Sequence, residues 1–190
     1  MAQEAGLVGF DVGDPSDSGK GAGRPAIPRH LLGALSGTDA GNIQSLAVFI
    51  DNNGDPNEAM AFGKQALADC GFIVPDPPAI LTTQGRRVGL YLIPEVGRRG
   101  TLEDLLLDAV FDADPHLRAC VDAFISCTKI PSGWQPNQQA KMKLEAIIAA
   151  HCARNPQCPL HCVWQEMDNP IPRNSPRFDG VRSFLRSLAQ

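Results

Sequence analysis

Two apolar runs along the chain predict the strands of a sheet. Residues 45–50 are almost continuously apolar and are followed at once by Asp51 and other polar residues. Residues 88–93 form a second run of this kind, and residues 6–12 form a third candidate strand. An apolar run with an abrupt polar end is typical of a strand that is buried on both faces of a parallel sheet.

A helical pattern separates the two main runs. Asp55 and Pro56 suit the N-cap and first position of a helix, and apolar residues then recur at helical spacing as far as Gly71. Residues 28–36 predict a shorter helix before the first run. The order strand, helix, strand predicts a βαβ unit and therefore an α/β fold with a parallel sheet.

The second half of the chain shows helical spacing only. Apolar stripes predict four helices, around residues 102–110, 119–124, 144–148 and 181–188. We therefore expect one α/β domain over residues 1–190, with a mainly parallel sheet flanked by helices and a helix-rich C-terminal part.

Composition narrows the classes of protein to consider. The 190 residues are 43% hydrophobic and 20% charged, which is typical of a globular protein. The net charge of −4 argues against attraction to nucleic acid by bulk charge, although it does not exclude a local basic patch.

The sequence also bears on where the protein is found. With no apolar run of the ~20 residues needed to span a bilayer, and no visible signal peptide, we expect a cytoplasmic protein with no membrane partner. Because disulfides are rare in the cytoplasm, we expect the six cysteines to be reduced thiols.

The end of the first strand is the strongest candidate site. Ligands of open α/β sheets bind beyond the carboxyl ends of the strands, where Asp51, Asn53 and Asp55 follow residue 50. Carboxylate and amide oxygens suit Mg²⁺. The alternative is turn chemistry, because the same residue types form strand-to-helix loops and Asp55 suits an N-cap.

A second acidic pair, Glu103 and Asp104, begins the helix after the second strand. These carboxylates could complete a cluster with Asp51. The alternative is helix capping: Thr101 and Asp104 have the spacing of a capping box, and acidic residues in a first turn favour the helix dipole. Capping accounts for Asp104 better than for Glu103.

Thiols and imidazoles gather between residues 151 and 162. Zinc favours such ligands, and the candidates are Cys152, Cys158, His161 and Cys162. Their spacing fits no standard zinc finger, and cysteine is also readily buried as a small apolar residue. A catalytic Cys/His pair lacks an evident orienting acid.

Basic residues supply candidate phosphate contacts. Arginine pairs at 86–87 and 98–99 flank the second strand, and Lys141 and Lys143 follow later in the chain. Of these, Arg87 and Lys141 are the predicted phosphate-binding residues, the alternative being a solvated surface. The glycine-rich residues 13–21 do not have the spacing of a phosphate-binding P-loop, and a loop is the better interpretation.

Three segments together resemble a known family. They are the first strand with its Asp51-Asn52-Asn53 end, residues 88–95 with Pro94 and Glu95, and residues 100–106 with Glu103. Residues 45–111 resemble the Toprim-like domain of an uncharacterised bacterial family, related to the Toprim half of the overcoming-lysogenisation-defect nucleases. The lysine-bearing helix at 141–144 and the segment 178–188 resemble the tail of that family.

The resemblance implies Mg²⁺-dependent chemistry on phosphodiesters. Asp51 and Asn53 match the Asp-x-Asp pair that holds Mg²⁺ in Toprim domains, with Glu103 as a possible third ligand. Asn53 replaces the second aspartate, and the strand carrying the family's general acid or base is absent. The resemblance therefore implies a chain without the family's first strand and helix, and no catalytic residue is assigned.

Three hypotheses follow. The first is a Toprim-like protein that binds or processes nucleic acid or nucleotide phosphates with Mg²⁺. The second is a catalytically degenerate Toprim-like module that binds a partner protein or a nucleotide. The third is a zinc-stabilised binding protein. Whether the protein is an enzyme stays open.

Overall fold

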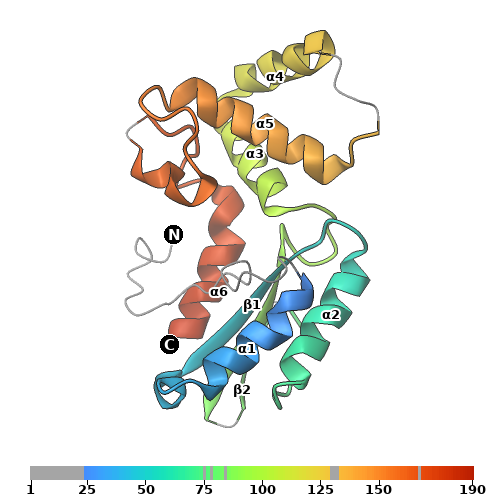
Figure 1. The fold of residues 1–190 in the computed structure, drawn as a ribbon, viewed down its shortest axis with the longest axis vertical. Coiled ribbons are helices and arrows are strands. Elements are labelled where there is room, and N and C mark those ends of the chain that lie inside the picture. The colour runs from blue at the N-terminus through green and yellow to red at the C-terminus, as the bar shows by residue number, and fades with distance from the viewer. Residues whose placement is uncertain (1–23, 75, 78, 84, 129–132, 167) are drawn as a thin grey trace. The chain divides into compact units, whose positions relative to one another are not determined.

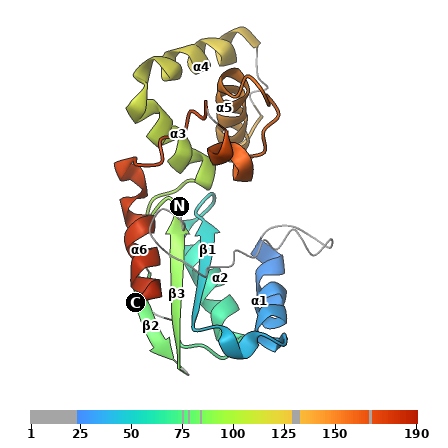
Figure 2. The same ribbon diagram turned by 90° about the vertical axis from the view of Figure 1, so that its left-hand side faces the viewer.

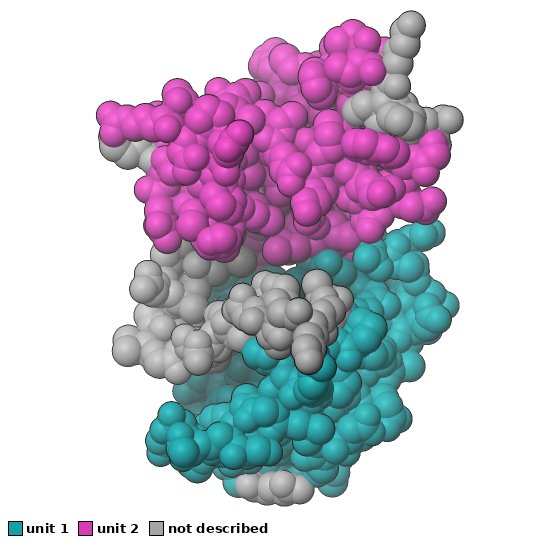
Figure 3. Space-filling model, viewed as in Figure 1, with its two compact units in different colours: residues 1–99, 180–190 teal, residues 100–179 magenta. Residues whose placement is uncertain are grey.

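A computed structural model describes residues 24–190, apart from residues 75, 78, 84, 129–132 and 167. The predicted strand at 6–12 and the loop at 13–21 lie outside the described residues. The chain divides into two compact units (Figure 3). Unit 1 contains the described residues up to Arg99 together with residues 180–190, and unit 2 contains Gly100–Asp179. Each unit is described by itself.

Unit 1 is built on a three-stranded mixed sheet. Its strands are β1 (Ser45–Asp51), β2 (Ile80–Thr83) and β3 (Arg86–Ile93), in the order β1-β3-β2. β1 and β3 are parallel, in a register that pairs Ser45 with Arg87 and Asp51 with Ile93. β2 runs antiparallel to β3. The α/β class and the parallel βαβ unit are confirmed, but a sheet with one parallel and one antiparallel pair is not the mainly parallel one expected.

Helices α1 (Ile27–Ser36) and α2 (Pro56–Ala68) cover one face of this sheet, as Figure 2 shows. Asp55 caps α2 and Pro56 begins it, as predicted. The core on this face combines strand residues with small residues of α2 (Val48, Ile50, Leu90, Leu92, Ala59, Ala66). α2 lies so close that a Cβ on Gly63 would be 2.6 Å from Leu90 Cδ1, which explains a glycine within the helix.

Helix α6 (Asp179–Ala189) covers the other face of the sheet (Figures 1 and 2). The ring of Phe184 packs against Phe49 and Tyr91, with centroids 5.6 and 5.1 Å away. Gly89 lies beneath that ring, and a Cβ there would be 2.7 Å from Phe184 Cζ. At the start of β1, Ser45 Oγ donates to Leu188 O at 2.8 Å and ties the strand to the end of α6.

Unit 2 is helical in its described residues. It contains α3 (Leu102–Ala113), α4 (Pro115–Thr128), α5 (Pro136–His151) and the short 3₁₀ helices η5 (Leu160–Gln165) and η6 (Pro176–Phe178). α3 packs against α4, α5 and η6. An ion pair also joins η6 to α3, because Arg177 donates to both carboxylate oxygens of Asp112, at 2.6 and 3.1 Å. The helix-rich C-terminal part is therefore confirmed. None of the described helices has the length and apolar character needed to cross a membrane.

Candidate functional site

The candidate site lies in unit 1, where β1 ends. Asp51 is the last residue of the strand and is half-buried, Asn52 is completely buried, and Asn53 is exposed. Parallel pairing places the end of β3 beside the end of β1, because Asp51 pairs with Ile93. The loop that follows β3 therefore belongs to the same edge of the sheet.

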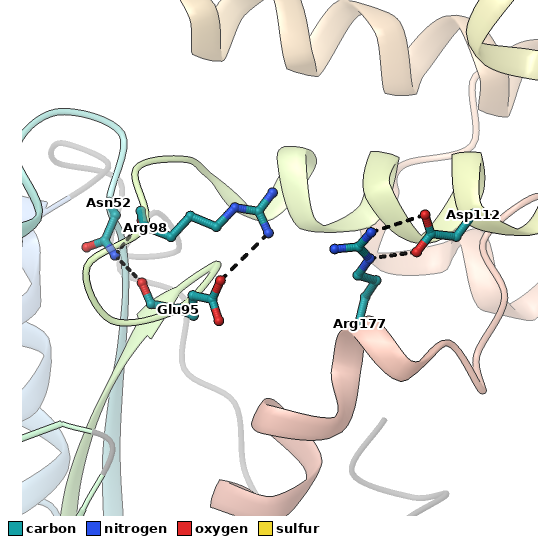
Figure 4. Close-up of polar contacts among 5 residues, drawn as sticks. All are labelled: Asn52, Glu95, Arg98, Asp112 and Arg177. Atoms are coloured by element: carbon teal, nitrogen blue, oxygen red, sulfur yellow. Dashed lines mark hydrogen bonds and ion pairs between the residues drawn. The ribbon is translucent and has the colours of Figure 1, made fainter. Parts of the chain in front are cut away.

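Asn52 holds these two chain segments together (Figure 4). Its Nδ2 donates to Glu95 O at 2.7 Å and to Arg98 O at 3.0 Å, and its main-chain N–H donates to Ile93 O at 2.8 Å. Its Oδ1 is buried and is the one buried side-chain oxygen or nitrogen without a hydrogen-bond partner in the described part of the chain. Buried acceptors are nearly always satisfied, so this atom is suited to a cation or to a donor from a ligand or water.

Two arginines converge on the neighbouring Asn53. Arg24 donates to Asp51 O and, at 3.3 Å, to Asn53 Oδ1. Arg99 donates through Nε to Asn53 O at 3.2 Å. Two guanidinium groups are thus within hydrogen-bonding distance of one residue at the strand end. Guanidinium groups carry a fixed positive charge and several N–H donors, so the pair makes this strand end locally basic.

Asp55 has a structural role. Its Oδ1 accepts a hydrogen bond from Asn57 N at 2.8 Å and caps α2. For this residue the structure supports the turn-chemistry interpretation. The same holds for Asp104, which forms the predicted capping box with Thr101 at the start of α3.

Arg87, one of the predicted phosphate contacts, lies at the opposite end of the sheet. It pairs with Ser45 at the start of β1. At a rise of about 3.3 Å per residue, the six residue steps to Asp51 are roughly 20 Å, so Arg87 does not join that site. Its neighbour Arg86 donates to the main-chain oxygens of Ile43 and Ala40. Arg99, from the other arginine pair noted in the sequence, is the one that contacts Asn53 at the strand end.

Glu103 and Lys141, predicted for different roles, line one groove in unit 2. Glu103 lies in the first turn of α3 and Lys141 on α5. They belong to another unit than Asp51, Asn53 and Arg87, so the structure does not assemble the predicted metal ligands or the predicted phosphate contacts within one unit.

The cysteine cluster of unit 2 is largely buried. Cys152 and Cys158 are buried, Cys162 is half-buried and His161 is exposed. Burial raises the pKa of the Cys158 thiol, and the nearby Glu166 raises it further. Zinc binds the thiolate, so a raised pKa opposes metal binding at pH 7. Among the described residues, no group of three or more His, Cys, Asp or Glu side chains is placed to hold a metal ion. Zinc binding stays a prediction.

A comparison with protein families shows which family the chain belongs to. Residues 26–190 match the family model described as "Protein of unknown function (DUF3226)". The chain belongs to the DUF3226 family. No match was found among curated proteins or among solved structures. The family description states no activity for this DUF3226 protein.

The strand end offers a limited donor set for Mg²⁺. Mg²⁺ usually takes one or two carboxylates and completes its shell with water and phosphate oxygens. Asp51 supplies one carboxylate at the strand end, and the unpartnered Oδ1 of the neighbouring Asn52 is buried. Asn53 Oδ1 already accepts from Arg24, so it fits the predicted ligand role less well. Successive residues of a strand point to opposite faces, so Asp51 and Asn52 do not by themselves form a chelating pair. An Mg²⁺ ion here would need further oxygens from water and from a bound phosphate, and it stays a prediction.

Proposed function

We propose that unit 1 is a Toprim-like domain that binds a phosphate-bearing ligand, a nucleic acid or a nucleotide, at the carboxyl end of β1. The observation that carries the proposal is the pair of guanidinium groups, from Arg24 and Arg99, on the two carbonyl oxygens of Asn53. A phosphate group would relieve their repulsion, and guanidinium groups match the geometry of phosphate oxygens. We expect this binding in the cytoplasm.

Other features of the strand end support an anion there. Asn52 fixes the loop that carries Arg98 and Arg99, because it binds the main chain at Glu95 and Arg98. Asp51 would hold Mg²⁺ next to the phosphate. When bound, the ion would neutralise phosphate charge.

A second hypothesis is binding without catalysis. Arg24 occupies the amide oxygen of Asn53, the position where Toprim domains carry a second carboxylate. No residue at this strand end is assigned as a general acid or base. We therefore propose ligand binding as the main activity and leave hydrolysis to the experiment. A partner protein at the same site would be the corresponding non-enzymatic alternative.

The test is a binding measurement on the full chain. Fluorescence anisotropy with a labelled single-stranded oligonucleotide, and competition by ATP, distinguishes nucleic acid from free nucleotide as the source of the phosphate. Each titration is run with Mg²⁺ and with a chelator. Arg99→Ala removes a charge-assisted contact worth about 1.5–3 kcal/mol, so we expect affinity to fall about tenfold or more. Asp51→Ala should abolish the Mg²⁺ dependence and any Mg²⁺-induced rise in melting temperature.

The matched control is Arg186→Ala, because Arg186 is an exposed arginine in the last turn of α6 of the same unit. It should leave the affinity unchanged. If neither ligand binds in the presence of Mg²⁺, or if Arg186→Ala weakens binding as much as Arg99→Ala, the proposal is wrong. Cleavage of the oligonucleotide by the unchanged protein but not by Asp51→Ala would favour the enzymatic hypothesis over the binding module.

A further inference from the structure

A groove in unit 2 is formed by one face of α5 and the chain that follows it. Its volume is about 450 Å³. The residues from α5 are spaced three or four positions apart along the helix and therefore share a face (Lys141, Leu144, Glu145, Ile148, Ala149). Residues 156–160 and Glu103, at the start of α3, also line the groove. Pockets that hold small molecules have volumes of about 300–1,000 Å³.

The floor of the groove is apolar. Leu144 and Ile148 are only 1% and 4% exposed, and Cys158 is 6% exposed. Prolines at 156 and 159 and Leu160 complete an apolar lining. Burial raises the pKa of Cys158, so its thiol contributes to this floor as a neutral group. The body of a ligand in this groove is therefore expected to be apolar.

Three charged side chains border this apolar floor: Glu103, Glu145 and Lys141. None of the three takes part in a side-chain hydrogen bond or an ion pair with another residue in the described part of the chain. The contrast with the adjacent Asp104 is informative, because Asp104 is used in the capping box of α3. Two carboxylates against one ammonium leave an excess of one negative charge at the groove.

We propose that this groove binds a small organic cation, consisting of an apolar body and one ammonium group. The body would lie on Leu144 and Ile148, and the ammonium would interact with Glu103 and Glu145. A ligand carboxylate of the same shape would meet two like charges and only Lys141 as a partner. The groove lies wholly in unit 2, so this proposal does not depend on phosphate binding in unit 1.

Three probes with one apolar body and different head groups test the proposal: phenylbutylamine, phenylbutanol and phenylbutyrate. Binding to the full chain is followed by ¹H–¹⁵N NMR, which also locates the contact. We expect the amine to shift amides of the groove, around Glu103, Lys141 and Leu160, and to bind at least about fivefold more tightly than the alcohol. The butyrate should bind most weakly.

Two variants isolate the charges. The double substitution Glu103→Gln and Glu145→Gln should bring the affinities for amine and alcohol together, and Lys141→Gln should strengthen amine binding. Glu58→Gln on α2 of unit 1 is the matched control and should change neither affinity. The substituted side chains lie at the border of the groove and not in the core, so we expect the variants to fold. A preserved NMR spectrum checks this. Equal affinities for amine and butyrate in the unchanged protein, shifts confined to other regions, or no binding of any probe would overturn the proposal.

Discussion

The two units use their polar residues in different ways. At the strand end of unit 1, polar side chains bind main-chain atoms. Asn52 donates to two carbonyl groups of the loop after β3, Arg24 donates to the carbonyl of Asp51 at the end of β1, and Arg99 donates to the carbonyl of Asn53. At the groove of unit 2, Glu103, Lys141 and Glu145 border an apolar floor and make no such bonds within the described residues. The first arrangement fixes a loop, while the second leaves charged groups for a ligand.

The two sites therefore differ in how rigid they are and in how many of their charged side chains remain unpaired. A site whose side chains are already bonded to the backbone is pre-organised, and its ligand must match a fixed geometry. In a groove whose charged side chains are solvated, ligand binding has to order those side chains, which costs conformational entropy. We therefore expect selective binding of a phosphate group in unit 1 and weaker binding, sensitive to charge, in unit 2.

The largest expected effect tests whether the two units are stable independently. Leu90, at the centre of the sheet of unit 1, and Leu144, on α5 of unit 2, are 0% and 1% exposed. Replacing either with alanine removes buried apolar volume, so we expect Leu90→Ala and Leu144→Ala each to lower the free energy of unfolding by about 2–5 kcal/mol. Hydrogen exchange should then show lost amide protection mainly in the unit that carries the substitution.

The two substitutions serve as controls for each other. An equal loss of protection in both units after either substitution would mean that the whole chain unfolds as one cooperative body. The comparison between the units would then describe two parts of a single folding domain, as the sequence analysis expected.

The next effect concerns Asn52, on which the rigidity of the first site depends. Asn52→Ala removes two hydrogen bonds and leaves the carbonyl groups of Glu95 and Arg98 without this donor. We expect a loss of about 1–3 kcal/mol in urea denaturation and a weaker phosphate site. Asn53→Ala is the matched control, because Asn53 is exposed and its main-chain contact to Arg99 survives the change. If Asn53→Ala destabilises the protein as much, Asn52 has no special role in holding the loop.

The sequence predicted the elements better than it predicted the site. The βαβ unit follows from two apolar runs and the Asp55-Pro56 helix start, because these signals are local. Strand β2 gives a much weaker signal, because it has four residues, only two of them apolar, and lies half-buried or exposed at the edge of the sheet.

Site residues depend on contacts between distant parts of the chain. Asn52 stands between Asp51 and Asn53 in the same polar loop, and only the position of the loop after β3 explains its burial. Arg87 and Arg99 are each the second residue of an arginine pair, but they lie at opposite ends of the sheet. Arg87 pairs with the start of β1, while Arg99 contacts the loop that follows β1. Glu103 and Lys141 were each noticed for their charge, while their common groove depends on how α3 packs against α5.

The smallest expected effect tests the ion pair between Arg177 and Asp112 in unit 2, whose charges bind each other and not a ligand. The hydrogen bond from Arg177 lowers the pKa of Asp112 below its ordinary value. A carboxyl whose pKa is lowered by folding adds stability above its unfolded pKa, about 3.9 for Asp, and loses that contribution as the pH falls through the lowered value. Asp112→Asn should therefore cause a small drop in melting temperature near pH 7, and the difference from the unchanged protein should vanish in acid. Asp122→Asn, at an exposed position of α4, should show no such pH-dependent difference. If the difference for Asp112→Asn instead stays constant from neutral pH into acid, the charge of Asp112 does not stabilise unit 2. The ion pair would then contribute no more to stability than the unpaired charges of the groove.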